Sequence, residues 1–220
     1  MSKHLHRELD KIKKKMLSLG ALVEERARMA LQAVESREAD LAEKIIHSDW
    51  EVDEMEVEIE EECLKLLALY QPVAVDLRFI IAIIKINNDL ERIGDEAVNI
   101  AQRVQVIAKR PPLQFVFDYA PMANRAQDML KMSLDALVNL DVDLAFKVIT
   151  MDDEVDKIQV EAYQQIKATI KDNPDRVSYL INLLLISRHL ERLADHSTNI
   201  AEEVIHLIEG EIVRHGKGMA

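Results

Sequence analysis

With 220 residues, of which 49% are hydrophobic, the chain is long enough for one domain or two small ones, each with its own core. Its net charge of -12 argues against nucleic acid as a partner, because a phosphate backbone repels an acidic surface. The single cysteine, Cys63, excludes an intrachain disulfide framework, and neither a signal peptide nor a membrane-spanning run is visible. We therefore expect a cytoplasmic protein for which cations are better ligands than polyanions.

Apolar residues recur at steps of three and four along almost the whole chain, and only 5 Gly and 5 Pro interrupt them. This pattern predicts an all-α fold. The first expected helix carries its apolar stripe over residues 5–34. The second is capped at or near Ser36 and has its stripe over residues 41–66.

The segment QPVAVDLR breaks the pattern before a third helix, whose stripe covers residues 83–107. Pro111 and Pro112 end this helix, because proline cannot continue one. Three consecutive helices joined by short connections favour an antiparallel bundle.

The second half of the chain then repeats the first. MALQAV at Met29 matches MSLDAL at Met132, an offset of 103 residues, and DWEVD matches DDEVD at the same offset. LERIGDEAVNIA at Leu90 matches LERLADHSTNIA at Leu190, with seven of twelve residues identical and an offset of 100. We therefore predict two tandem antiparallel three-helix bundles, residues 1–112 and 113–210, followed by a tail, residues 211–220.

Polar residues recur in register in both copies of the third helix. They stand four residues apart, which places each set in one row beside the apolar stripe. The rows are Glu91, Asp95 and Asn99 in the first half, and Glu191, Asp195 and Asn199 in the second. Carboxylates at this spacing repel one another unless a multivalent cation shares their charge. The rows therefore predict one metal site in each bundle, against the alternative of a merely solvated helix face.

The preceding helices are expected to complete an acidic layer around each row. Counting back from the turns brings further carboxylates to the same level. On the second helix of each bundle these are Asp49, Asp53, Asp152 and Asp156. On the first helices they are Glu25 and Asp128, whose helical phase is less favourable.

Motifs typical of enzymes are missing from the sequence, which contains no HExxH, P-loop, GxSxG or CxxC. One ferritin-like Glu-x-x-His pair, Glu203 with His206, has no counterpart in the first half. His196, beside Asp195, is either an additional ligand or a surface histidine, since its counterpart is Glu96. A carboxylate-bridged metalloenzyme and a helical scaffold without metal both remain open at this point.

Three segments together resemble the PhoU family: LYQPVAVDLRFI at Leu69, NDLERIGDEAVNIA at Asn88 and RHLERLADHSTNIAEEV at Arg188. The resemblance covers nearly all residues up to Gly210. It implies paired three-helix bundles with multinuclear metal clusters on the E/D-x-x-x-D helices. By this resemblance the metal-site residues are Glu91, Asp95, Glu191 and Asp195, and iron is the first metal to expect, with zinc, manganese or magnesium as alternatives.

The same resemblance implies an adaptor rather than a catalyst. Members of the family work with the ATPase of a phosphate ABC transporter and with a phosphate sensor histidine kinase. They repress the phosphate-starvation response when phosphate is plentiful. A protein of this kind reaches the membrane only through its partners, and a homodimer is compatible with it. The DLR motif, Asp76 to Arg78, has no equivalent in the second half, so any role of that loop belongs to the first bundle.

Overall fold

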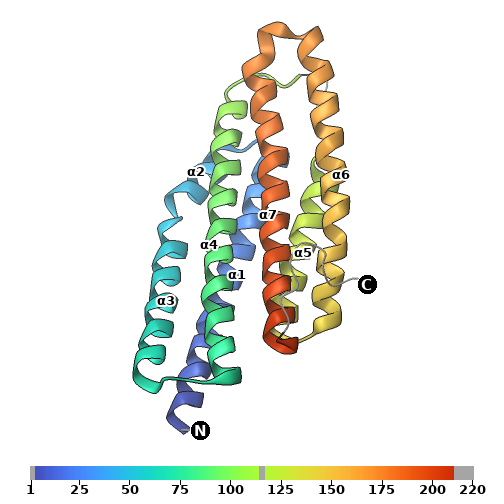
Figure 1. Cartoon of the computed structure of the whole chain (residues 1–220). Coiled ribbons are helices and arrows are strands. Elements are labelled where there is room, and N and C mark those ends of the chain that lie inside the picture. Colours follow the sequence, from blue (N-terminus) through green and yellow to red (C-terminus); the bar gives the residue numbers. More distant parts are fainter. Residues whose placement is uncertain (1–2, 114–116, 211–220) are drawn as a thin grey trace.

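The structure is a computed structural model that describes residues 3–113 and 117–210, so the predicted tail, residues 211–220, lies outside it. Every regular element in the described part is helical, which confirms the all-α prediction (Figure 1). The first half contains α1 (Lys3–Ser36), α2 (Ala39–His47), α3 (Trp50–Tyr70) and α4 (Ala74–Ala108). The second half contains α5 (Ala120–Asn139), α6 (Val142–Asp172), a 3-10 turn (Pro174–Arg176) and α7 (Val177–Glu209). None of the described helices is long and apolar enough to cross a membrane.

The two halves are similar helical bundles that lie side by side, with α4 and α7 adjacent at the centre (Figure 1). Apolar residues of both helices are fully buried, for example Ile86 and Ile93 on α4 and Ile186 and Leu190 on α7. They belong to one hydrophobic core that continues through both halves. The predicted pair of bundles is therefore present, and the apolar residues of the two bundles form one continuous core.

The helix predicted over residues 41–66 is interrupted in the first half, which corrects the prediction of a single second helix there. Ser48 and Asp49 separate α2 from α3, whereas α6 continues unbroken through the corresponding Met151. The hydroxyl of Ser48 donates to the carbonyl oxygens of Lys44 at 2.8 Å and Ile45 at 3.2 Å. These bonds satisfy carbonyl groups of the last turn of α2.

The turn after the first helix of each half repeats in conformation as well as in sequence position. Arg37 and Leu140, 103 residues apart, both adopt left-handed backbone, with φ of 57° and 52°. The cap of the second helix was predicted at or near Ser36. Ser36 itself belongs to the last turn of α1, where its hydroxyl donates to the carbonyl of Gln32 at 2.9 Å. Glu38 occupies the cap position of α2 without a side-chain cap.

A glycine sets the distance between α3 and α4. A Cβ on Gly94 would lie 3.2 Å from Cγ1 of Val52, which is closer than an ordinary van der Waals contact. The small residue therefore lets the two helices approach. Because Asp53 follows Val52 and Asp95 follows Gly94, this contact also brings two of the predicted site residues to the same level.

Candidate functional site

The first acidic layer lies where α3 meets α4. Burial raises the pKa of Asp49 to about 6, and the negative charges of Asp53 and Asp95 add to the rise. Burial also raises the pKa of Asp95, followed by the charge of Asp53. For Glu91, burial comes first again, followed by the charges of Asp95, Glu56 and Asp53. Carboxylates from the two helices therefore share one electrostatic environment, in which ionised forms disfavour one another.

The second acidic layer, between α6 and α7, contains the counterparts of Asp49, Asp53, Glu91 and Asp95, whereas Gln159 stands at the position of Glu56. Burial raises the pKa of Asp152 to about 6, with the charges of Asp195 and Asp156 next in importance. The pKa of Asp195 also rises to about 6, through burial and then the charges of Glu191 and Asp156. The pKa of Glu191 is raised by burial and by Asp156. Each layer thus joins two aspartates of the second helical segment to the Glu-x-x-x-Asp pair of the third.

The donor chemistry of both layers fits a hard cation, because carboxylate oxygens are the ligands that such ions prefer. A bound cation would also relieve the repulsion that raises these pKa values. As the side chains stand, no three His, Cys, Asp or Glu residues of the described chain are arranged to hold an ion. Binding therefore requires rotation of carboxylates that are partly or fully exposed, such as Asp53, Asp95 and Asp195. Metal binding stays a prediction.

The remaining candidates lie outside the two layers. Glu25 and Asp128 are exposed on α1 and α5, and the charges that raise the pKa values in the layers come from other residues. Asn99 and Asn199 turn toward the contact between α4 and α7. Their side-chain amides donate to carboxylates of α4, namely Glu96 at 3.5 Å and Asp89 at 3.2 Å.

Two carboxylate–imidazole pairs join α4 to α7. Oδ1 of Asp89 lies 2.9 Å from Nδ1 of His196, and Oε2 of Glu96 lies 2.6 Å from Nδ1 of His189. Residues 89 and 189 correspond in the repeat, as do residues 96 and 196. The two pairs are therefore related by the approximate twofold symmetry of the halves, with both acids on α4 and both histidines on α7.

Further polar contacts lie along the contact between α4 and α7, which we call the seam. Nη1 of Arg192 lies 3.0 Å from Oε1 of Glu96. Burial alone would raise the pKa of Glu96, but the hydrogen bond and charge of His189, together with Arg192, hold it below its usual value. Nζ of Lys85 lies 2.9 Å from both carboxylate oxygens of Glu203. The acid of the ferritin-like Glu-x-x-His pair is thus engaged across the contact between the halves.

Sequence reasoning did not find this seam. His196 was expected to be a ligand or a surface histidine, yet it is buried and bonded to Asp89. A signal was available in the aligned repeats. Acids at positions 89 and 96 are replaced by histidines at 189 and 196, seven residues apart and so on one helix face. Acids in one repeat that are replaced by histidines in the other predict that the two faces meet.

The seam also connects the second half to the first acidic layer. An open polar depression of about 580 Å³ over the α4–α7 contact is lined by Glu91, Asp95 and Glu96, together with Arg192 of α7. The positive charge of Arg192 acts to lower the pKa of Asp95, against the larger effect of burial. The two layers therefore have separate carboxylates but are not electrostatically independent.

Comparison with known proteins agrees with this architecture. The family model for the PhoU domain matches twice, over residues 16–104 and 120–204. The chain is 39% identical over 211 residues to a phosphate-specific transport system accessory protein PhoU homolog of Aquifex aeolicus, covering 96% of each chain. It is 36% identical over 216 residues to the homolog of Pseudomonas aeruginosa, covering 98% of this chain and 89% of the relative.

Solved structures are similar over the same extent. The crystal structure of PhoU from Pseudomonas aeruginosa matches with a TM-score of 0.90 and 35% identity, covering 94% of this chain and 99% of that one. The phosphate transport system regulatory protein PhoU from Streptococcus pneumoniae matches with a TM-score of 0.88 and 31% identity, covering 96% and 100%. With both halves matched and relatives aligned over almost their whole length, the chain belongs to the PhoU family and contains two PhoU domains in tandem.

Proposed function

We propose that this chain is an accessory protein of a phosphate-specific transport system, in which it acts as an adaptor and negative regulator and not as an enzyme. The observation that carries the proposal is the match of both halves to the PhoU domain, together with relatives of that name over 96% of the chain. The absence of enzyme motifs from the sequence and the long, closely packed helices also favour docking over turnover.

The proposed partners are the transporter ATPase and a phosphate sensor histidine kinase, which the chain would contact at the cytoplasmic face of the membrane. In phosphate-rich conditions these contacts would hold the kinase in a repressing state and limit uptake. A rigid protein of two joined bundles suits this role, because its surfaces keep a fixed distance from each other and two partners can bind to them at the same time.

We also propose that the acidic layers bind hard cations in clusters, with iron first and zinc, manganese or magnesium as alternatives. Glu91 and Asp95 would hold the first cluster together with Asp49 and Asp53. Glu191 and Asp195 would hold the second together with Asp152 and Asp156. The cations would supply positive charge that the layers lack, so the chain's carboxylates could stay ionised at neutral pH without mutual repulsion.

Elemental analysis of protein purified without chelator or a nickel column tests the metal proposal. Asp95→Ala should empty the first layer and leave the second largely occupied, and Asp195→Ala should do the reverse. Glu161→Ala, which removes an exposed carboxylate of α6, is the control and should keep the wild-type metal content. If the double variant Asp95→Ala with Asp195→Ala keeps the wild-type metal content, the carboxylate rows do not bind metal and are only solvated helix faces.

Deletion of the gene tests the regulatory proposal. Phosphate-starvation genes should become active in phosphate-rich medium, and phosphate uptake should lose its control. Wild-type protein should restore both, and a variant lacking Glu91, Asp95, Glu191 and Asp195 shows whether metal is required. If expression and uptake are unchanged by the deletion, the adaptor proposal fails, and metal-dependent turnover by the purified protein would then favour a metalloenzyme.

A further inference from the structure

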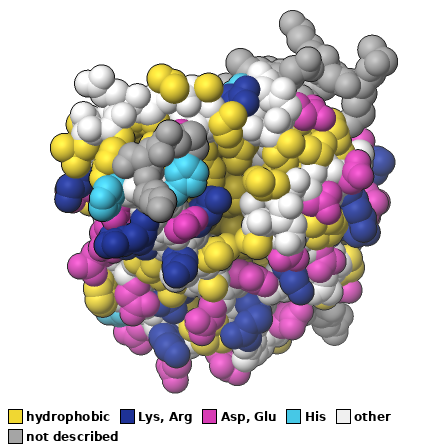
Figure 2. Space-filling view, turned by 90° about the horizontal axis from the view of Figure 1, so that it is seen from below, with side chains coloured by type: hydrophobic (Ala, Val, Ile, Leu, Met, Phe, Trp, Pro, Cys, Tyr) yellow, Lys and Arg dark blue, Asp and Glu magenta, His cyan; other side chains and the backbone are white. Residues whose placement is uncertain are grey.

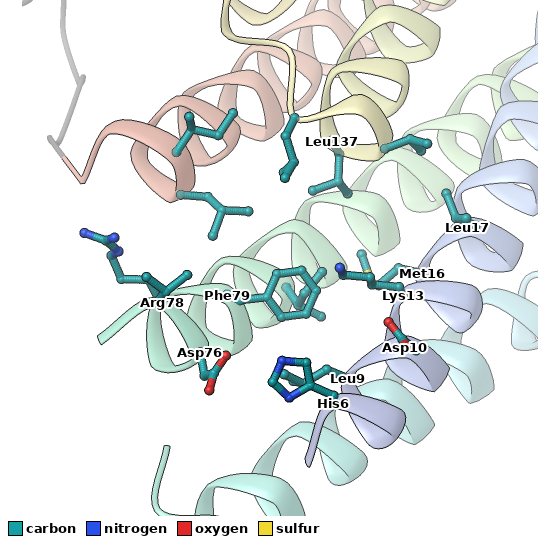
Figure 3. A pocket seen from close by; sticks show the side chains of 16 residues that line it. His6, Leu9, Asp10, Lys13, Met16, Leu17, Asp76, Arg78, Phe79 and Leu137 are labelled. Carbon is teal, nitrogen blue, oxygen red and sulfur yellow. The ribbon is translucent and has the colours of Figure 1, made fainter. Parts of the chain in front are cut away.

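A pocket of about 500 Å³ opens at the end of the molecule where α1, α4, α5 and α7 converge (Figure 3). Its inner wall is formed by buried apolar side chains of both halves, including Leu9, Met16, Ile83 and Leu207. Neither half could form this pocket alone, because α1 and α4 supply one side and α5 and α7 the other. In Figure 2, which views the molecule from this end, hydrophobic side chains gather between charged ones.

The rim of the pocket exposes more apolar surface than folding requires. Val75 is 61% exposed and Val138 is 52% exposed, and both line the opening. The exposure continues along the adjoining start of α4, where Val73 is 74% and Leu77 is 39% exposed. Contiguous apolar surface around a concavity marks a binding surface more often than a chance feature. A small molecule in the pocket would leave the outer residues bare, whereas a macromolecular segment could cover both.

Two cations, Lys13 and Arg78, lie at the mouth of the pocket. Arg78 and Lys13 lie on either side of Phe79 in Figure 3, and Nζ of Lys13 is 5.0 Å from the centroid of the Phe79 ring. Within the part of the chain that the structure describes, neither forms an ion pair. The surrounding segment of α1 is also basic, with five Lys or Arg against two acids over residues 7–15 of a chain whose net charge is -12.

We propose that this pocket is a docking site for an amphipathic helix of a partner protein, with an apolar ridge and acidic residues on its flank. The apolar ridge would enter the pocket and cover the exposed residues Val73, Val75 and Leu77 at the start of α4, as helices bind in hydrophobic grooves. The acidic flank would meet Lys13 and Arg78, where partly desolvated charges favour one partner over others. The partner's place in phosphate transport rests on the function proposed above, but the site itself does not.

Other occupants fit the pocket less well. Asp10 and Asp76 also line the rim, so the acidic residues of a helix must lie beside Lys13 and Arg78 and away from these two carboxylates. An anionic membrane has a flat and uniformly charged surface, which cannot avoid the two carboxylates and would not fill a concavity. A second copy of this chain would need its own complementary acidic ridge, and such a contact between unlike surfaces does not close into a dimer. The experiment must therefore distinguish binding of a helix from binding of a membrane and from association with a second copy of the chain.

The test uses full-length protein and a fluorescein-labelled synthetic peptide of about five helical turns, with leucines on one face and glutamates on both flanks. Fluorescence anisotropy should show saturable binding to the wild type. Val138→Asp should weaken binding by about tenfold or more, because the new carboxylate would face the apolar ridge. The matched control is Val160→Asp on α6, whose valine is 55% exposed and does not line the pocket. This control should bind within about twofold of wild type.

A charge exchange tests the rim. Lys13→Glu should weaken binding of the glutamate-flanked peptide and strengthen binding of a lysine-flanked peptide. Lys14→Glu changes the neighbouring exposed lysine outside the pocket and should have neither effect. Circular dichroism confirms that each variant is folded. The proposal is overturned if wild type binds neither peptide, or if Val160→Asp loses binding as much as Val138→Asp.

Two further results would assign the surface to a different occupant and so overturn the helix proposal. One is sedimentation of the wild type, but not Val138→Asp, with phosphatidylglycerol vesicles. The other is a wild-type dimer in analytical ultracentrifugation that Val138→Asp makes monomeric. Failure of peptide binding leaves the gene-deletion result untouched, so this proposal and the regulatory function can fail separately.

Discussion

The raised pKa of Asp152 predicts that removing its charge increases the stability of the protein. Asp152→Asn should stabilise the metal-free protein at neutral pH, although it removes a charged side chain from a folded structure. In the folded protein the carboxyl group binds its proton more tightly than in the unfolded chain, since its pKa rises from 3.8 to about 6. Its favourable contribution is therefore complete below about pH 3.8 and is lost as the pH rises through about 6. The amide of asparagine resembles the protonated form and avoids that loss.

The size of the effect follows from the shift. A rise from 3.8 to about 6 corresponds to roughly 3 kcal/mol. Asp152 is only partly buried, so solvent screening should reduce this to about 1 kcal/mol. For a chain of this length that is an increase in Tm of about 2–4 °C at pH 7.5 in the presence of chelator.

Thermal unfolding between pH 4.5 and 7.5 measures the effect. The gain in Asp152→Asn should shrink toward pH 4.5, and Glu161→Gln, an exposed position on the same helix, should show none of it. Added metal should stabilise the wild type more than the variant, because binding raises stability by mass action. A lower Tm for Asp152→Asn at pH 7.5 in chelator would refute the reasoning, since it would mean that the folded protein stabilises the ionised carboxylate.

Two other substitutions test the packing of the fold. Glu96→Ala should lower the free energy of unfolding by about 2–3 kcal/mol, because it leaves His189 at the seam without its carboxylate. In urea unfolding, the double variant with His189→Ala should cost about 1 kcal/mol less than the sum of the single changes, and strict additivity would contradict the pairing. Gly210→Ala should lower Tm and cost about 1 kcal/mol, because the residue caps α7 at φ 76° and its Cβ would lie 2.5 Å from Nη1 of Arg78. An unchanged Tm would mean that neither constraint operates.

Much of the fold could be predicted because its signals are local. Apolar periodicity defines the helices, and helix geometry places Glu91 and Asp95 in one row whatever the packing. Counting from the turns was sufficient to bring Asp53 to the level of Asp95, since both helices run antiparallel from a short connection. Asn99 belongs to the same row by spacing, but only the packing of α7 shows that it turns toward Glu96.

The missed features depend on particular side chains or on contacts distant in sequence. The break between α2 and α3 falls at Ser48 and Asp49, where the second half has Met151 and Asp152 in an unbroken helix. Neither residue is a usual helix breaker, so periodicity gave no warning. The docking pocket could not be predicted either, because it exists only where Leu9 and Leu207, almost two hundred residues apart, share one wall.

The exchange of acids and histidines along the α4–α7 seam has a consequence for how the two halves recognise each other. If two copies of the first half associated through the same seam, Asp89 would oppose Glu96, and carboxylate would meet carboxylate. If two copies of the second half did so, His189 would oppose His196. Only a first half packed against a second half forms both carboxylate–imidazole pairs. The residues of the seam therefore disfavour association between two identical halves. The duplicated halves have thereby become specific for each other, and neither can change at these positions without a matching change in the other.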